Sequence, residues 1–333
     1  MKNILVTGGA GFIGFHTAAR LLRDGLNVTV YDNYNDYYAV SLKEDRTAEL
    51  MRIAEEAPGK LTVVRGDLTD QERLEKTFAE GAFDTVINLA AQAGVRYSID
   101  HPDTYIESNI VGFLRILEAC RHYPVEHLVY ASSSSVYGGN TKVPFSEKDP
   151  VDEPVSLYAA TKKSNELMAH CYAKLYGIPC TGLRFFTVYG PWGRPDMAAF
   201  LFADAICHDR PIKVFNNGDL ERDFTYIDDI VEGVVRVAAS PAPPSEKGVR
   251  ARVYNIGNHT PVKLMDFIRM IEEAIGKEAK KEFLPMQPGD VYRTFADVDE
   301  LTRDFDFHPS TPLEEGLKAF AGWYREYYGL QDQ

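Results

Sequence analysis

TGGAGFIG, residues 7–14, lies between a predicted strand at Asn3–Thr7 and a predicted helix at Phe12–Asp24. Glycines let a chain turn tightly and let its backbone approach a pyrophosphate, and a helix N-terminus offers unpaired N–H groups to the phosphates. A glycine triplet is also found in plain strand-to-helix turns, so the neighbouring sequence has to decide between the two interpretations.

A second predicted strand, Asn27–Tyr31, is followed directly by Asp32, eighteen residues after Gly14. A carboxylate at this distance accepts hydrogen bonds from both hydroxyls of a ribose and repels a 2′-phosphate, which favours NAD over NADP. Gly66-Asp67-Leu68 and Leu89-Ala90-Ala91 follow two further strands, at the edge where an open parallel sheet binds its ligand. The residues expected to contact the cofactor are Gly8, Gly11, Phe12, Ile13, Gly14, Asp32, Asp67, Leu68, Leu89, Ala90 and Ala91.

Short apolar runs alternate with segments of helical period through the first half of the chain, which predicts an α/β fold with a doubly wound parallel sheet. We expect a dinucleotide-binding domain at residues 1–186, with 224–260 returning to it, and a smaller α/β substrate lobe at 187–333. The other predicted strands are Leu61–Arg65, Thr85–Asn88, His127–Ala131, Cys180–Phe185 and Tyr254–Ile256. The other predicted helices are Gln71–Glu80, Thr104–His122 and Leu157–Tyr176.

Composition excludes several classes of function. The net charge of −13 argues against nucleic acid or an anionic membrane surface as a partner. No apolar run is long enough to span a bilayer and no signal peptide opens the chain, so we expect a cytoplasmic protein. The four cysteines have no metal-binding spacing, so we expect buried free thiols and no bound metal.

Tyr158 and Lys162 lie four residues apart in a predicted helix, so their side chains share one face. A lysine ammonium near a phenol stabilises the phenolate, and we therefore expect a lowered pKa for Tyr158. Such a tyrosine can take a proton from a substrate hydroxyl and later return it. A tyrosine and a lysine at this spacing are also common on helix surfaces, but none of the other tyrosines in this chain has a lysine four residues later.

TGGAGFIG, YAATK at residues 158–162 and SSSSVYG at residues 132–138 together resemble the extended short-chain dehydrogenase/reductase superfamily. YAATKKSNE (158–166) and FTVYGPWGRPDMA (186–198) are similar to the bacterial UDP-glucuronate 4-epimerases of capsule synthesis. The resemblance covers nearly the whole chain. It implies Tyr158 as catalytic acid and base, Lys162 as its partner on the nicotinamide ribose, and Ser133 as a hydrogen-bonding hydroxyl.

Ser134 and Ser135 distinguish between relatives of this superfamily. Members that eliminate water or carbon dioxide carry acidic residues after the hydroxyl that corresponds to Ser133. Serine cannot act as a carboxylic acid or base near neutral pH, so dehydration and decarboxylation are disfavoured. The reaction that remains is an epimerisation: a hydride is removed from C4, the 4-keto sugar turns, and the hydride returns.

A 4-keto uronic acid loses carbon dioxide readily, so the site has to protect its carboxylate. We expect Ser134, Ser135 and Thr187 to hold the carboxylate through neutral hydrogen bonds, and Arg194 to anchor the sugar or its carboxylate. By resemblance, Arg222 meets the UDP diphosphate and Asp290 faces the uridine ribose. Glucose-type 4-epimerases carry arginine at the position of Gln287, so Arg293 is a candidate to replace it. Asn33 and Asn109 are further candidates for cofactor contacts, and Val214 and Phe215 for substrate contacts.

Other functions stay open at this point: a UDP-glucose or UDP-N-acetylhexosamine 4-epimerase, a 4,6-dehydratase, a UDP-glucuronate decarboxylase, or a non-catalytic NAD-binding regulator. The resemblance also implies a homodimer in which Thr104–His122 and Leu157–Tyr176 pair with the same helices of a second copy. Leu114, Leu117, Leu167 and Cys171 can serve either that interface or the internal core.

Overall fold

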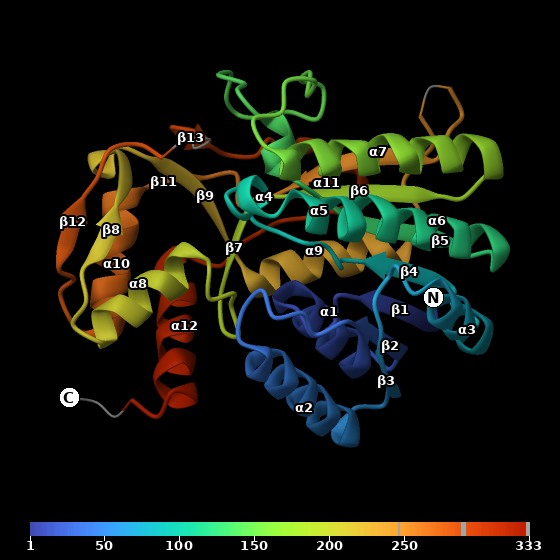
Figure 1. Ribbon diagram of the computed structural model, residues 1–333, viewed down its shortest axis with the longest axis horizontal. Helices are drawn as coiled ribbons and strands as arrows, with labels where there is room; N and C mark the ends of the chain where they lie inside the picture. The colour runs from blue at the N-terminus through green and yellow to red at the C-terminus, as the bar shows by residue number, and fades with distance from the viewer. Residues whose placement is uncertain (246, 288–290, 331–333) are drawn as a thin grey trace.

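The computed structural model describes residues 1–245, 247–287 and 291–330, and a seven-stranded sheet runs through its centre (Figure 1). Its strand order is β10-β6-β5-β4-β1-β2-β3, and every pair of neighbouring strands is parallel. The strands are β1 (Asn3–Thr7), β2 (Asn27–Asp32), β3 (Leu61–Arg65), β4 (Thr85–Asn88), β5 (His127–Ser133), β6 (Cys180–Phe185) and β10 (Ala251–Ile256). The predicted doubly wound α/β fold is therefore confirmed, and β2 and β5 run slightly further than expected.

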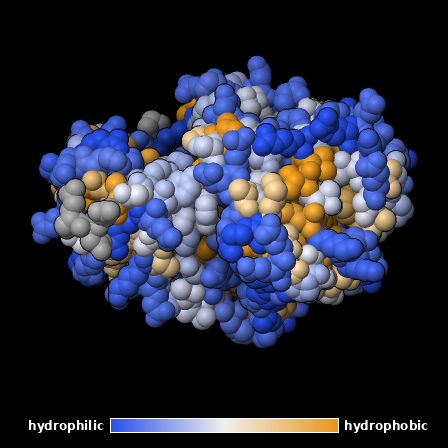
Figure 2. Space-filling model, turned by 90° about the horizontal axis from the view of Figure 1, so that it is seen from below, coloured by the Kyte–Doolittle hydropathy of each residue, from blue (hydrophilic) through white to orange (hydrophobic). Residues whose placement is uncertain are grey.

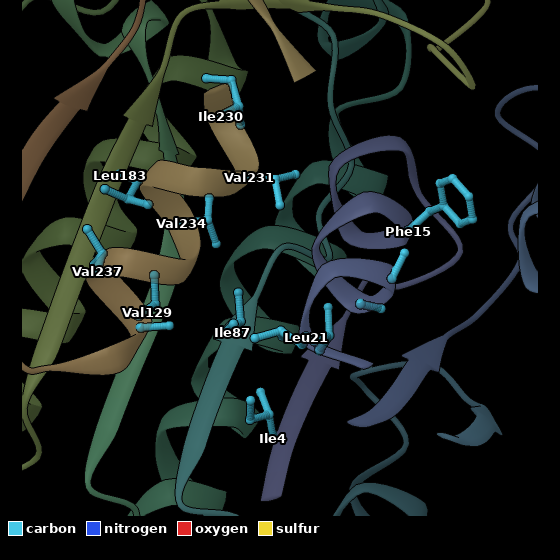
Figure 3. Close-up of a cluster of buried hydrophobic side chains, with 14 of the residues drawn as sticks. Ile4, Phe15, Leu21, Ile87, Val129, Leu183, Ile230, Val231, Val234 and Val237 are labelled. Atoms are coloured by element: carbon cyan, nitrogen blue, oxygen red, sulfur yellow. The ribbon is translucent and has the colours of Figure 1, made fainter. Parts of the chain in front are cut away.

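Side chains of the central strands alternate between two hydrophobic layers, as expected for a sheet covered on both faces. Ile4 and Val6 belong to the layer under α1 (Phe12–Arg23) and α9 (Ile227–Ala239), part of which Figure 3 shows. Leu5 belongs to the opposite layer, against α3 (Gln71–Gly81), α6 (Gly112–His122) and α7 (Leu157–Tyr176). This packing fixes the carboxyl ends of the strands in place.

Among the helical segments that differ from the predictions are two in the first half of the chain. Helix α2 (Val40–Glu56) was not foreseen, because its buried face carries Lys43, Arg46 and Thr47 beside its leucines, and this obscures the apolar stripe. Residues 104–122 are not one α-helix: α5 (Pro102–Tyr105) leads into a π-helix at Ile106–Val111 before α6 begins. The wider turn accompanies the burial of the Asn109 side chain, which bonds the backbone of Gln92.

A smaller unit stands on the left of Figure 1 and has its own hydrophobic core. Strand β9 is at the centre of its larger sheet, paired with β7 and β13 in parallel and with β11 antiparallel, while β8 and β12 form a two-stranded sheet. Strand β10 returns to the large sheet beside β6, so the predicted return of Tyr254–Ile256 is confirmed. The elements are β7 (Thr187–Tyr189), α8 (Ala198–Cys207), β8 (Ile212–Val214), β9 (Glu221–Tyr226), β11 (Pro261–Lys263), α10 (Leu264–Ile275), β12 (Lys281–Phe283), β13 (Arg293–Thr294) and α12 (Leu313–Tyr327). The remaining short helices are α4 (Tyr97–Asp100), α11 (Asp299–Phe305) and the turns Ser134–Tyr137 and Phe215–Gly218.

The four cysteines are free thiols, but they are not all buried. Cys120 and Cys180 lie in the core, whereas Cys207 is half-buried and Cys171 is exposed on α7. The expectation of four buried thiols is therefore wrong for Cys171, because the helix face that carries it points away from the sheet.

The face seen in Figure 2 is mainly hydrophilic, in keeping with the net charge of −13. Among the residues that the structure describes, no helix is both long enough and apolar enough to cross a membrane. In the same described residues, His, Cys, Asp and Glu side chains form no group of three or more that can hold a metal ion.

Candidate active site

A cavity of about 570 Å³ opens at the carboxyl ends of the parallel strands. It includes the ends of β1 and β4, where the strand order reverses and open α/β sheets bind their ligands. Most of the residues proposed from sequence line it: Gly8, Gly11, Phe12, Ile13, Gly14, Asp32, Asn33, Asp67, Leu68, Leu89, Ala90, Ala91, Ser133, Ser134, Ser135, Tyr158, Lys162, Thr187 and Arg194. The cofactor and substrate candidates therefore share one cavity.

Glycine is required at Gly8, directly after β1, and at Gly14, in the first turn of α1. Gly8 has a φ of +68°, and a Cβ there would lie 2.7 Å from the backbone nitrogen of Ala90. A Cβ on Gly14 would lie 2.1 Å from the carbonyl oxygen of Gly8. The loop therefore packs closely on the first turn of α1, whose N–H groups can face an anion.

Asp32 is buried at the end of β2 and accepts backbone hydrogen bonds on both of its oxygens. The N–H groups of Tyr34 and Ala10 donate to them at 2.8 and 3.1 Å. Burial raises the pKa of Asp32, while these hydrogen bonds and the nearby charge of Lys43 lower it. One carboxylate thus holds the glycine-rich loop and still lines the cavity, where it can accept further hydrogen bonds.

Tyr158, Lys162 and Ser133 lie together on one side of the cavity. Tyr158 hydrogen-bonds Ser133, the last residue of β5, and Lys162 donates from Nζ to the carbonyl of Ala131 on the same strand at 2.9 Å. The Ser133 hydroxyl also caps the turn that follows, accepting from the N–H of Ser135 at 3.1 Å. Helix α7 and strand β5 therefore position all three side chains.

The pKa of Tyr158 differs from the expectation. Burial is the largest influence on Tyr158 and raises its pKa, while Ser133 and the charge of Arg194 lower it. Burial also lowers the pKa of Lys162 to about 8. The expectation that Lys162 lowers the pKa of Tyr158 is thus wrong for the chain itself, since desolvation outweighs attraction and the ammonium is directed at Ala131.

Arg194 enters the cavity as half of an ion pair. Its Nε and NH2 groups donate to the two carboxylate oxygens of Asp196 at 3.0 and 2.6 Å, and the Tyr37 hydroxyl donates to the same carboxylate at 3.1 Å. Thr187, on β7, lines the cavity as well. This bidentate pairing fixes the plane of the guanidinium and leaves NH1 for another acceptor.

Several candidates do not line the cavity. Asn109 lies behind the wall, where it accepts from the N–H of Gln92 at 2.8 Å and donates to the carbonyl of Gln92 at 3.0 Å. Val214 and Phe215 lie in the smaller unit, where the Phe215 ring is 5.6 Å from the guanidinium of the cavity residue Arg96.

Two arginine candidates are held on the sheet of the smaller unit. Arg222 donates to the carbonyls of Glu221 and Tyr292, and Arg293 forms an ion pair with Glu221 at 2.6 Å. The Oε1 atom of Gln287 is buried without a hydrogen-bond partner among the described residues. Asp290 lies outside the described residues.

Tyr37, Lys43 and Asp196 are among the polar residues of the cavity that sequence reasoning missed. Tyr37 and Lys43 belong to the loop and helix after β2, a region whose helix was not foreseen. Asp196 had a usable signal, because an acid two residues after an arginine in a loop can pair with it. Lys43 donates to the carbonyl and the side-chain oxygen of Asn35, each at 2.7 Å. No local sequence pattern predicts these two hydrogen bonds.

Comparisons with known proteins agree with this geometry. The family model described as "NAD dependent epimerase/dehydratase family" matches residues 4–257. The chain is 54% identical to protein CapI of Staphylococcus aureus over 98% of this chain and 99% of that protein. It is 48% identical to a probable UDP-glucuronate 4-epimerase of Rhizobium meliloti over 97% of both chains. The crystal structure of a UDP-glucuronic acid 4-epimerase from Bacillus cereus, in complex with UDP-glucuronic acid and NAD, superposes with a TM-score of 0.88 at 34% identity, covering 98% of this chain and all of that one.

Proposed function

This chain belongs to the NAD dependent epimerase/dehydratase family, and we propose that it is a UDP-glucuronate 4-epimerase, which interconverts UDP-glucuronate and UDP-galacturonate. The observation that carries the proposal is the set of side chains around Tyr158. Ser134, Ser135, Thr187 and Arg194 line the same cavity as Tyr158, and no acid follows Ser133 directly. This set suits a uronate that is oxidised and reduced without losing water or carbon dioxide.

NAD is the cofactor, and the glycine-rich loop and Asp32 fit it. The close approach of Gly8 and Gly14 leaves no room for a Cβ, as a backbone cradle for a pyrophosphate requires. Asp32 supplies a carboxylate for the adenosine ribose. NAD, when bound, would supply the acceptor for the hydride that leaves C4 of the sugar and returns to it.

Tyr158 moves the proton that accompanies each hydride transfer. It takes the proton of the C4 hydroxyl as the 4-keto sugar forms and gives it back after the sugar has turned. Its burial opposes the phenolate, so nearby positive charge is needed, and Arg194 supplies part of it. Ser133 bonds the phenol and shares the proton path, and Lys162 orients the nicotinamide ribose.

Ser134, Ser135 and Thr187 bind the sugar carboxylate with neutral hydroxyls, and NH1 of Arg194 anchors it. This contact keeps the bond from C5 to the carboxylate out of line with the carbonyl π system of the 4-keto intermediate, so decarboxylation is slowed. Arg222, Arg293, Val214, Phe215 and Asp290 are assigned to the UDP moiety.

The ion pair between Arg194 and Asp196 supports a second candidate, a UDP-glucose or UDP-N-acetylhexosamine 4-epimerase. Asp196 neutralises much of the charge of Arg194, and a neutral sugar needs no anion site. The two candidates differ in the substrate that is converted, so one assay separates them.

The test is incubation of purified protein with UDP-glucuronate, with and without added NAD, followed by proton NMR of the sugar. UDP-galacturonate rising to a steady ratio supports the proposal. Formation of a UDP-pentose would make the protein a decarboxylase, and conversion of UDP-glucose alone would favour the second candidate. Tyr158→Phe should lower kcat by about 10²- to 10⁴-fold, whereas Tyr172→Phe on the same helix should leave it unchanged.

We propose in addition that the protein is a homodimer formed through the outer face of α7 and the helical stretch 102–122. Leu117 is buried against the sheet, but Leu167 is 57% exposed and Ile106 is 42% exposed. Cys171 is exposed on the same helix as Leu167. A helix pair with exposed apolar side chains of this size suits a second copy of itself.

A further inference from the structure

Arg46 is a fully buried arginine of α2 that the mechanism above does not use. Its guanidinium pairs with no carboxylate within ion-pair distance in the described part of the chain; its hydrogen bonds all go to neutral oxygens. NH1 donates to the carbonyl of Ala10 at 3.0 Å and to the hydroxyl of Tyr38 at 2.8 Å. Burying a charge that is hydrogen-bonded only by carbonyls and a phenol costs free energy of folding, so the position of Arg46 requires an explanation.

The other oxygens that Arg46 binds belong to the loop that carries Arg194. Nε and NH2 donate to the carbonyl of Trp192 at 3.2 and 2.7 Å, and NH2 also donates to the carbonyl of Gly193 at 3.2 Å. Trp192 has a φ of +61°, a left-handed conformation that is unfavourable for a residue with a bulky side chain. The hydrogen bonds from Arg46 hold the carbonyl of Trp192 in the orientation that the left-handed backbone conformation gives it.

One guanidinium therefore ties two loops together. Ala10 lies in the glycine-rich loop, and Trp192 and Gly193 directly precede Arg194. The indole of Trp192 packs on Phe15 of α1 and on Trp323 of α12, with ring centroids 5.5 Å apart in each case. The ring contacts fix where the loop lies, while the arginine fixes the direction of its carbonyls just before Arg194.

We propose that Arg46 is a positioning residue for substrate recognition: it locks the 190–194 loop to the glycine-rich loop and thereby sets the place of Arg194 at the sugar carboxylate. The proposal rests on the proposed function, because it assigns the carboxylate to Arg194. It makes α2 a determinant of the preference for a uronate over a neutral hexose, although Arg46 itself does not touch the substrate.

The residue type fits this role. The planar guanidinium has five N–H donors in a fixed fork and reaches Ala10, Tyr38, Trp192 and Gly193 at once. A lysine has one flexible ammonium and cannot bind both loops in the same way. Arg46→Lys should therefore keep the charge and lose most of the positioning.

The experiment is a double-mutant cycle on the purified full chain, with Arg46→Met, Arg194→Met and the double variant. Arg46→Met should lower kcat/KM for UDP-glucuronate about 10- to 100-fold, mainly through KM. The inhibition constant of UDP-glucose, which has no carboxylate, should change less than about threefold, since it lacks the group that is misplaced. In the Arg194→Met background, Arg46→Met should have almost no further effect on UDP-glucuronate.

Three further variants complete the series. Tyr38→Phe removes one partner of Arg46 and keeps the ring, so it should give a smaller loss of the same kind, and it serves if Arg46→Met does not fold. Arg52→Met, on the exposed side of α2, is the matched control and should behave as the wild type. Arg46→Lys should resemble Arg46→Met in kinetics.

The outcomes separate the two hypotheses. If the wild type converts UDP-glucuronate but the losses at Arg46 and Arg194 multiply, Arg46 acts independently of Arg194 and the positioning role is rejected. Equal losses for UDP-glucuronate and UDP-glucose would show general destabilisation and reject it as well. If the wild type does not convert UDP-glucuronate, the proposed function fails and the role of Arg46 in uronate recognition fails with it.

Discussion

At the scale of single residues, the candidate site places groups that ionise where water is excluded. Lys162 is buried and Tyr158 is partly buried, and desolvation opposes the charged form of each: it raises the pKa of the phenol and lowers that of the ammonium. The chain therefore does not hold the phenolate by itself. Positive charge from Arg194 and from the bound cofactor has to stabilise the phenolate when the site is filled.

Lys162 provides a test of this desolvation. Its folded-state pKa of about 8 lies below the ordinary 10.5, so between these pH values the unfolded chain binds a proton that the folded chain does not. Stability therefore rises with pH in this window, and below pH 8 the buried ammonium carries its full cost. Lys162→Met should raise the free energy of unfolding of nucleotide-free protein by about 1–3 kcal/mol at pH 7, and by less at pH 9.5.

Chemical unfolding at the two pH values measures this difference, with Lys174→Met near the end of the same helix as control. A Lys162→Met protein that is less stable than the wild type at pH 7 would mean that the bond to Ala131 outweighs desolvation. The variant should also be almost inactive.

The proposed carboxylate site provides a second test at this scale. Ser135→Ala and Thr187→Ala each remove one hydroxyl from the cavity and should weaken binding of UDP-glucuronate by about 1–2 kcal/mol, a several-fold to 30-fold rise in KM. Released UDP-pentose should increase, because the carboxylate is then free to align with the 4-keto group. Product analysis by NMR checks both effects, and unchanged KM and by-product in both variants would contradict the assignment.

At the scale of elements, α7 carries Tyr158 and Lys162, the proposed catalytic pair, and is held to the sheet by a buried ion pair. Arg184 on β6 donates from Nε and NH2 to the two oxygens of Glu166 at 2.8 and 2.9 Å. Ser132 on β5 donates to the same carboxylate at 2.7 Å, and Arg184 also donates to the Tyr137 hydroxyl at 2.9 Å. The network joins α7 to the strands β5 and β6 on the C-terminal side of Tyr158.

Breaking one half of this pair should be worse than removing both halves. Glu166→Met leaves the Arg184 charge buried and should lower the free energy of unfolding by about 3–5 kcal/mol. The double variant Glu166→Met/Arg184→Met should recover much of that loss, to within about 2 kcal/mol of the wild type. Urea unfolding of the single and double variants measures the coupling, and strictly additive losses would argue against an interacting pair.

At the scale of the whole molecule, the exposed apolar face of α7 tests the proposed dimer. Leu167→Lys places a charge at its centre and should shift the protein to monomers, as measured by light scattering during size-exclusion chromatography. Leu201→Lys is the matched control: Leu201 is similarly exposed, at 51%, but lies on α8 in the smaller unit. A wild type that is monomeric at micromolar concentration, or an unchanged mass for Leu167→Lys, would contradict this interface.

The sequence predicted the large sheet well because its strands are buried on both faces and read as continuous apolar runs. The residues proposed from sequence line the candidate cavity where they lie at or just after a strand end, as Asp32, Ala90 and Ser133 do, since parallel strands bring their carboxyl ends to one edge. The sequence failed for α2, whose buried face includes charged residues, and for the π-helix, whose wider turn has no periodic signal.

What the sequence determined by itself is therefore the strands of the large parallel sheet, the helices α1, α3 and α7, the glycine-rich loop and the spacing of Tyr158 and Lys162, because these depend on local pattern and on rules of strand connection. Only the tertiary structure decided which groups meet across long distances in the chain: Asp196 with Tyr37, and Arg46 with Ala10 and Trp192. It also decided the direction of the pKa shifts, since these depend on how much water the packed lobes exclude from each group. Such contacts and burial arise only when distant segments pack together, so no local pattern in the chain encodes them.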